Sequence, residues 1–173
     1  MTMPALEILA RRRVPLGFVL AIATIVLARP TWPAWRVGLL VAVCGEAIRI
    51  WAAGHLEKSR EVTRSGPYRW TAHPLYVGSV VLASGVVIAS RSAVVAVLTA
   101  LYLGSTITAA IRTEEAFLRR RFGERYDLYR RAEGEPMVRR FSIERAIRNR
   151  EYRAVIGLAI GFALLALEVL LSI

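Results

Sequence analysis

Two short segments of the chain carry residue types that can bind a charged ligand. The first, Ser65–Gly78, reads SGPYRWTAHPLYVG and leads into an apolar run. Pro74 suits the first turn of a helix, where its missing N–H costs nothing, and it keeps His73 out of helical geometry. The free N–H groups of that helix start can receive a carboxylate. Gly78, one turn further in, allows a ligand or another helix to approach closely.

The second segment supplies carboxylates and aromatic rings. Glu114 and Glu115 follow a later apolar run, and the sequence FGERY begins shortly afterwards at Phe122. Each motif alone has an ordinary interpretation, because a His-Pro pair often marks only a helix start and paired glutamates are often solvated. The run from Phe122 to Tyr129 is by itself typical of an amphipathic interfacial helix. Their combination predicts a site only if the fold brings them together.

Five apolar runs are available to position these motifs. Each is close to the roughly 17 to 25 residues that cross a bilayer as a helix, and the first is the shortest. We therefore predict an all-α, polytopic membrane bundle that forms one domain over residues 1–173. A cytoplasmic-interface helix over Glu114–Arg131 follows the fourth span. The predicted spans are Val14–Ala28, Trp35–His55, Pro74–Ser90, Ala93–Ile111 and Ala154–Ile173.

The composition agrees with a membrane protein. The 173 residues are 55% hydrophobic, yet their formal net charge is +11. Apolar spans joined by basic loops explain both values, and the position of the basic residues in those loops argues against nucleic-acid binding. Cys44 is the single cysteine and there are two histidines, so we expect neither an internal disulfide nor a metal site.

The basic residues also predict an orientation. Twenty of them lie before span one, between spans two and three, or between spans four and five, against three on the opposite side. The N-terminus is therefore expected in the cytoplasm and the C-terminus outside the cell membrane. No small-residue cleavage site precedes Arg29-Pro30, so we expect the first run to be a retained span and not a signal peptide. Spans three and four, joined by Ser90–Ser92, should form an antiparallel hairpin that brings both motifs to the cytoplasmic face.

In this order, the motifs resemble those of the isoprenylcysteine carboxyl methyltransferase and phospholipid methyltransferase families, over roughly residues 62–140. The resemblance implies an integral membrane enzyme that binds S-adenosylmethionine in a helical site at the cytoplasmic ends of the hairpin. Trp70 would add to the aromatic walls around the adenine. The cofactor-binding residues that it implies are Tyr68, Arg69, His73, Pro74, Leu75, Tyr76 and Glu114.

The resemblance also implies an apolar acceptor that enters from the bilayer among the membrane lipids. Candidate acceptors are a prenylated thioether carboxylate, a phospholipid amine and a small thiol. Glu115 is the candidate general base, and Arg112 is the candidate residue for orienting an anionic acceptor.

Two departures from the family pattern keep other functions open. Ala72 stands where an arginine usually precedes His-Pro, and Ala110 stands where the prenylcysteine branch has an arginine that faces the substrate carboxylate. A non-catalytic membrane scaffold is therefore a second hypothesis. A reductase that binds NADPH is a third, since sterol reductases resemble these enzymes in the same hairpin.

Two further features lie within the spans. Glu46 and Arg49 are three residues apart in span two, so they can pair with each other or line the acceptor pocket. Gly157 and Gly161 in the last span allow close helix packing, either against the rest of the bundle or in a homodimer.

Overall fold

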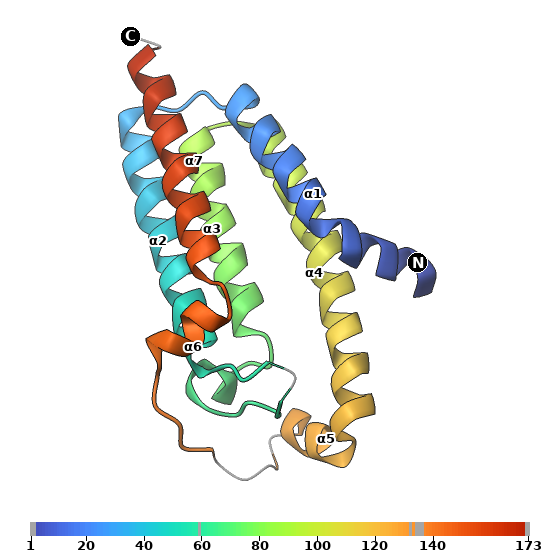
Figure 1. The fold of residues 1–173 in the computed structure, drawn as a ribbon. Coiled ribbons are helices and arrows are strands. Elements are labelled where there is room, and N and C mark those ends of the chain that lie inside the picture. The colour runs from blue at the N-terminus through green and yellow to red at the C-terminus, as the bar shows by residue number, and fades with distance from the viewer. Residues whose placement is uncertain (1–2, 59, 132, 134–136, 172–173) are drawn as a thin grey trace.

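The protein is a bundle of long helices, as Figure 1 shows. The computed structural model describes residues 3–58, 60–131, 133 and 137–171, and these residues form no β-strand. The predicted all-α class is therefore confirmed. In chain order the elements are α1 (Met3–Leu27), α2 (Trp32–His55), the 3₁₀ turn η1 (Gly66–Arg69), α3 (Pro74–Ser90), α4 (Ala93–Phe122), α5 (Glu124–Arg130), α6 (Ile143–Arg148) and α7 (Tyr152–Leu171).

The five predicted spans fall on α1, α2, α3, α4 and α7. Three of these helices, α2, α4 and α7, are long and apolar enough to cross a membrane by length and composition. The apolar parts of the other two, Val14–Leu27 and Pro74–Ser90, are shorter. Helix α1 begins well before its predicted span and contains Pro15. The chain is thus a polytopic helical membrane protein.

The fourth span continues further than predicted. Helix α4 does not stop near Ile111 but runs without a break to Phe122. The helical character predicted for Glu114–Arg131 is confirmed, but the stretch is divided between two helices. Its first part continues α4, because no glycine or proline precedes Gly123 to interrupt the span. Gly123, at a φ of +50°, ends α4 in a conformation that favours glycine, and α5 begins at the next residue. Both glutamates of the motif therefore lie on the last turns of a membrane helix.

Helices α2 and α3 pack closely along their length. A Cβ added to Gly45 would lie 2.7 Å from Leu82 Cα and 2.8 Å from the carbonyl oxygen of Gly78, so the two backbones are in direct contact there. A Cβ on Gly85 would likewise lie 2.7 Å from the Cβ of Ala42. Small residues on both helices therefore create this interface.

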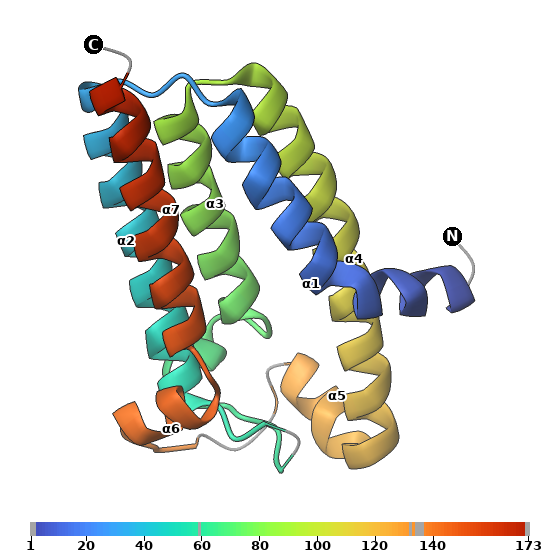
Figure 2. The ribbon, with the colours of Figure 1, turned by 45° about the horizontal axis from the view of Figure 1, so that its top comes forward.

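Helix α4 packs mainly along α1 and not along α3. The tight turn at Arg91, which has a φ of +49°, makes α3 and α4 antiparallel as predicted. Figures 1 and 2 both show that the two helices then diverge from this turn. The predicted hairpin is therefore open, because each of its arms has a better packing partner elsewhere in the bundle.

Helix α7 covers the other side of α2. Phe162 and Leu165 are buried in the shared core, and the indole Nε1 of Trp35 donates to the carbonyl oxygen of Phe162 at 2.9 Å. A Cβ added to Gly157 or Gly161 would have no heavy atom within 4 Å, so these glycines do not make this interface. Packing of these glycines against a second copy stays a prediction.

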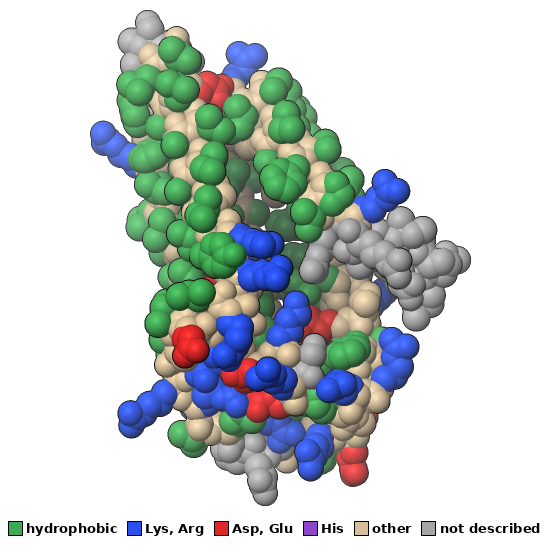
Figure 3. Space-filling view, in the orientation of Figure 1, with side chains coloured by type: hydrophobic (Ala, Val, Ile, Leu, Met, Phe, Trp, Pro, Cys, Tyr) green, Lys and Arg blue, Asp and Glu red, His purple; other side chains and the backbone are tan. Residues whose placement is uncertain are grey.

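One end of the bundle carries most of the charge, and we call α5, α6 and the loop 56–73 the charged end. Figure 3 shows Lys and Arg side chains gathered there and hydrophobic side chains over the rest of this face. The Asn149 amide donates to the carbonyl oxygens of Ala53 and Leu56, both at 2.9 Å. Arg145 Nε donates to the carbonyl oxygen of Gly54 at 2.8 Å. Both side chains therefore satisfy carbonyl groups that the end of α2 leaves free.

Candidate active site

The two sequence motifs meet at the charged end, although α3 and α4 have diverged. The Tyr76 hydroxyl donates to Glu114 Oε2 at 3.1 Å. His73 Nε2 lies 3.3 Å from Glu115 Oε1, and its Nδ1 lies 3.9 Å from Glu114 Oε2. One imidazole therefore faces both carboxylates, and residues about forty positions apart in the sequence meet as predicted.

The loop before α3 sets the position of His73. His73 precedes α3 with φ and ψ of −133° and 54°, which are outside the helical region, and Pro74 is the first helical residue. The Tyr129 hydroxyl on α5 donates to the carbonyl oxygen of Tyr68 at 2.8 Å. It also approaches the carbonyl oxygen of Thr71 at 3.4 Å. Helix α5 thus fastens the loop that carries the histidine.

Helix α5 also contributes to the charge balance of the carboxylates. Arg130 Nη2 lies 3.5 Å from Glu115 Oε1, the same oxygen that faces His73. The Glu115 side chain is only 18% exposed, and it lies between His73 and Arg130. Glu115 thus contacts the His73 ring on one side and Arg130 on the other.

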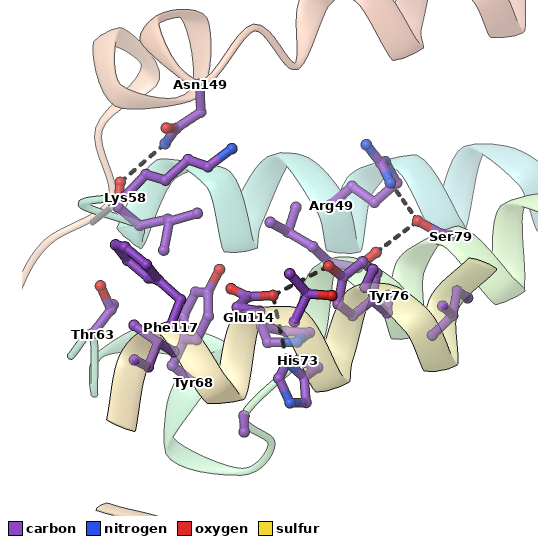
Figure 4. A pocket seen from close by; sticks show the side chains of 18 of the residues that line it. Arg49, Lys58, Thr63, Tyr68, His73, Tyr76, Ser79, Glu114, Phe117 and Asn149 are labelled. Atoms are coloured by element: carbon purple, nitrogen blue, oxygen red, sulfur yellow. Dashed lines mark hydrogen bonds and ion pairs between the residues drawn. The ribbon is translucent and has the colours of Figure 1, made fainter. Parts of the chain in front are cut away.

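A cavity of about 960 Å³ lies beside this cluster. It begins among charged and aromatic side chains at the charged end and continues between the diverging helices to Val14, Tyr102 and Leu103. Figure 4 shows Glu114 and Tyr76 in its middle, with Lys58 and Phe117 on one side and Arg49 and Ser79 on the other. One cavity therefore joins a polar region to an apolar region inside the bundle.

Most of the predicted cofactor-binding residues line this cavity. Six of the seven do so: Tyr68, His73, Pro74, Leu75, Tyr76 and Glu114. Arg69 does not, because it follows Tyr68 in the 3₁₀ turn and is exposed to solvent while Tyr68 is buried. Trp70 is 74% exposed and lies against Trp51, with 5.5 Å between ring centroids.

The two residues predicted as catalytic are also outside the cavity wall. Glu115 contacts His73 but does not line the cavity, and Arg112 is exposed. Arg112 lies about 200° around α4 from Ala110 and from Glu114, both of which face the cavity. The structure thus gives no support to Arg112 as a group that orients an acceptor. Ala72 and Ala110, the two departures from the family pattern, both line the cavity.

Several lining residues were missed by sequence reasoning. On α4 they share one face, and the helical period of 3.6 residues is the signal that could have found them once Glu114 was chosen. Lys58, the single lysine of the chain, and Asn149 come from the loop after α2 and from the end of α6. The missed residues of α4 and α5 are Tyr102, Leu103, Thr106, Ile107, Thr113, Phe117, Leu118, Tyr126 and Tyr129.

The tyrosines at the charged end stay protonated over the physiological pH range. Burial, and then the neighbouring Glu115, raise the pKa of Tyr126 to about 12. Burial, and then Tyr126, raise the pKa of Tyr129 to about 12. Burial also raises the pKa of Tyr68 far above its ordinary value. These phenols are therefore neutral, and among them the Tyr129 hydroxyl donates hydrogen bonds to the loop before α3.

The Glu46–Arg49 pair predicted inside span two is present, and one of its two residues lines the cavity. Arg49 Nε lies 3.4 Å from Glu46 Oε2, so the two residues do pair. Arg49 also lines the cavity, where it reaches Ser79 on α3 and Glu151 just before α7. The pair is thus part of a larger charged cluster that joins three helices.

The chain is therefore a polytopic helical membrane protein with an internal cavity that opens at its charged end. A family model described as phospholipid methyltransferase matches residues 16–125, which is more than half of the chain. The chain therefore belongs to the phospholipid methyltransferase family, a family of membrane methyltransferases. The match begins much earlier than the motif-based resemblance over residues 62–140, and it ends before α6 and α7.

A curated relative is the nickel-cobalt-cadmium resistance protein NccN of Alcaligenes xylosoxydans xylosoxydans. It is 35% identical to this chain over 97 residues, which cover 55% of this chain and 46% of the relative. The chain thus aligns with about half the length of that protein. No solved structure matches the chain.

Proposed function

We propose that the protein is an S-adenosylmethionine-dependent methyltransferase that acts on an apolar or lipid-like acceptor, as isoprenylcysteine carboxyl methyltransferases do. The observation that carries the proposal is the cavity shared by the His73–Glu114–Tyr76 cluster and the apolar space between α3 and α4. A charged cofactor and an apolar acceptor can meet at the boundary of these two regions. Membership of the family supports methyl transfer as the reaction.

The lining residues fit the cofactor in charge and shape. Glu114 offers a carboxylate to its ammonium or ribose hydroxyls, and Lys58 offers a cation to its carboxylate. Tyr68, Tyr76 and Phe117 offer aromatic surface to its adenine. A cavity of about 960 Å³ is at the upper end of the roughly 300 to 1,000 Å³ typical of small-molecule sites, which leaves room for an acceptor.

The chain's own contribution is chiefly to hold groups in place and to exclude water. When bound, S-adenosylmethionine supplies a methyl group already activated by its positive sulfur. Tyr76 fixes the Glu114 carboxylate through its hydrogen bond, and His73 lies against both glutamates. These contacts fix the polar side chains before any ligand enters, so little reorganisation is needed at the site.

The acceptor region is lined by apolar side chains of α1 and α4. Val14, Leu103, Ile107 and Ala110 lie along it, on the side where α4 has separated from α3. An apolar chain can therefore enter from the bilayer between α3 and α4, while the cofactor enters from the charged end. The acceptor classes in view are a prenylated thioether carboxylate, a phospholipid amine and a small thiol.

Calorimetric titration of detergent-purified protein with S-adenosylmethionine and with its demethylated product tests the proposal. We expect micromolar binding that is lost or much weakened in Glu114→Ala. Glu144→Ala is the matched control, because Glu144 is exposed on α6 and does not line the cavity. Its affinity should equal that of the parent protein.

Three results would count against the proposal. Binding of NADPH by folded protein that ignores S-adenosylmethionine would favour a reductase. Binding of neither ligand, with normal thermal unfolding, would favour a scaffold that has kept the fold. Equal losses in both glutamate variants would show that the site is elsewhere.

We also propose that the charged end faces the cytoplasm of the cell that makes the protein, with the C-terminus outside. The concentration of arginines there supports this orientation. In a Cys44→Ser background, a membrane-impermeant thiol reagent applied to intact cells should label Arg91→Cys and spare Arg120→Cys. The opposite labelling pattern would reverse the orientation and place the cofactor site outside the cell.

A further inference from the structure

The α6–α7 junction, residues 143–153, lies beside the end of α2 (Figure 1) and carries two exposed isoleucines. Ile143 and Ile147 are 61% and 56% exposed, and they share one face of α6 because they are four residues apart. Arg145 and Asn149, which bond to the end of α2, lie on the other side of the helix. The two isoleucines therefore face the surroundings of the protein.

Two tryptophans place this junction at the surface of the membrane. Trp51 of α2 and Trp70 are both exposed, with 5.5 Å between their ring centroids, and exposed tryptophans near the end of a span are typical of the membrane–water interface. Helix α6 bonds to the carbonyl oxygens of Ala53 and Gly54, only about 3 to 5 Å further along α2 than Trp51. The isoleucines thus lie near the boundary between acyl chains and headgroups, where an amphipathic segment places its apolar face.

The charged side chains of the junction are mostly basic. The junction contains four arginines and two glutamates, and one of these glutamates, Glu151, is buried and paired with Arg49. Arg150 and Arg153 are exposed and form no ion pair with any residue that the structure describes. The guanidinium carbon of Arg153 lies 6.0 Å from the ring centroid of Tyr152, which is also exposed. Two cations without a carboxylate partner therefore lie beside exposed apolar side chains.

The backbone at Arg150 does not favour an arginine. Its φ of +63° is in the left-handed region, which glycine adopts more readily than a residue with a side chain. The chain turns here from α6 into α7. Glycine would suit this turn better, so the fold itself does not explain the positive charge at this position.

We propose that the α6–α7 junction is a docking surface for anionic phospholipid headgroups of the surrounding bilayer. Arg150 and Arg153 bind the lipid phosphate, and Ile143 and Ile147 contact its acyl chains. Arginine forms charge-assisted hydrogen bonds with phosphate, and an anionic lipid is favoured over a zwitterionic one because no ammonium offsets its charge. Phosphatidylglycerol has this chemistry. It carries no amine or thiol to be methylated, so the proposal does not depend on the function proposed above.

The docking surface belongs to the C-terminal part of the chain. Residues 143–153 lie outside residues 16–125, the part that matches the family. Asn149 and Glu151, on either side of Arg150, both line the cavity. A lipid held at this surface is therefore next to the cavity wall but outside the cavity.

Native mass spectrometry tests the proposal, with protein in a neutral maltoside detergent and equal amounts of dioleoylphosphatidylglycerol and dioleoylphosphatidylcholine. We expect the parent protein to retain the anionic lipid preferentially. Arg150→Gly combined with Arg153→Gln should weaken that retention about tenfold. The glycine relieves the left-handed φ, so this variant should fold, and thermal unfolding verifies it.

A matched control removes the same charge elsewhere at the charged end. Arg120→Gln combined with Arg121→Gln alters two exposed arginines in the last turn of α4. At 30 residues α4 is about 45 Å long, so its last turn extends past a hydrocarbon core of roughly 30 Å. We expect this variant to keep most of the preference for the anionic lipid.

Two further measurements separate a lipid from a free anion. Ile143→Ser combined with Ile147→Ser should lower the retention of both lipids and leave their ratio unchanged. Inorganic phosphate at millimolar concentration should not displace the lipid, and displacement would overturn the proposal in favour of a site for free anions. Equal losses in the two arginine variants would overturn it as a nonspecific effect of charge. Absence of a preference in the parent protein would overturn it whether or not the variants fold.

Discussion

The two halves of the bundle use their helices in opposite ways. On one side α2 and α3 touch backbone to backbone through glycines such as Gly45 and Gly85. On the other side α4 leaves α3 and follows α1, and a cavity of about 960 Å³ lies between the arms. The close packing of α2 against α3 supplies stability that an open cavity cannot. The separation of α4 from α3 is tolerated for this reason.

The largest effect should come from adding one methyl group to the closely packed half. Gly45→Ala places a Cβ against Leu82 and Gly78, where backbone atoms cannot move aside, so we expect a loss of roughly 2–4 kcal/mol in unfolding free energy. Gly157→Ala is the matched control, because nothing lies within 4 Å of that position. Thermal unfolding in detergent compares the two. Equal midpoints would mean that the α2–α3 contact is looser than described.

A much larger side chain should be tolerated in the open half. Ala110→Phe projects into the cavity one helical turn from Glu114, where the proposed acceptor and cofactor regions meet. We therefore expect an unfolding free energy within about 1 kcal/mol of the parent and S-adenosylmethionine binding weakened about tenfold. Ala109 is fully buried and does not line the cavity, so Ala109→Phe should destabilise the protein instead. Titration calorimetry measures the S-adenosylmethionine affinity of the two variants, and thermal unfolding measures their stability. Similar behaviour of both variants would contradict the difference between the two faces of α4.

The attachment of α6 to the end of α2 should have an intermediate effect. Asn149→Ala removes two hydrogen bonds to the end of α2, which should cost about 1–2 kcal/mol and speed amide exchange at Leu56. Arg148→Ala removes an exposed ion pair with Glu57 and should cost less than about 0.5 kcal/mol. Hydrogen exchange followed by mass spectrometry measures the protection of the end of α2 in both variants. Unchanged protection in the first variant would show that α6 does not hold α2.

The smallest effect near neutral pH concerns the phenols of α5. Tyr126 and Tyr129 have a folded-state pKa of about 12, above the ordinary value of about 10. Their contribution to stability is therefore complete below pH 10 and is lost as the pH rises towards 12. Absorbance titration of tyrosinate should show two late steps, and Tyr129→Phe should remove one. Titration of all tyrosines near pH 10 in folded protein would contradict their burial.

Much of the architecture could be predicted because apolar length and basic loops depend on local sequence. The meeting of His73 with Glu114 and Glu115 followed from antiparallel helices alone. The opening between α3 and α4 could not be predicted in this way. It arises because α3 packs against the glycines of α2 while α4 packs against α1, and no local pattern specifies these partners.

Arg112 was predicted for its chemistry alone. Its angular position on α4 places it away from the cavity wall, and that position was not considered in the prediction. The ion pair between Arg49 and Glu151 could not be predicted, because the two residues are about a hundred positions apart and no local pattern relates them.

The unequal lengths of α3 and α4 connect the site to the lipid around it. At 17 and 30 residues, the two helices are about 26 Å and 45 Å long, on either side of the roughly 30 Å of a hydrocarbon core. The longer helix α4 can match a thicker bilayer by reducing its tilt, but α3 has no length to spare. His73 directly precedes the short helix α3, and Glu114 lies on the long helix α4. We therefore expect the thickness of the bilayer to change the relative position of these two side chains, and with it the shape of the cavity.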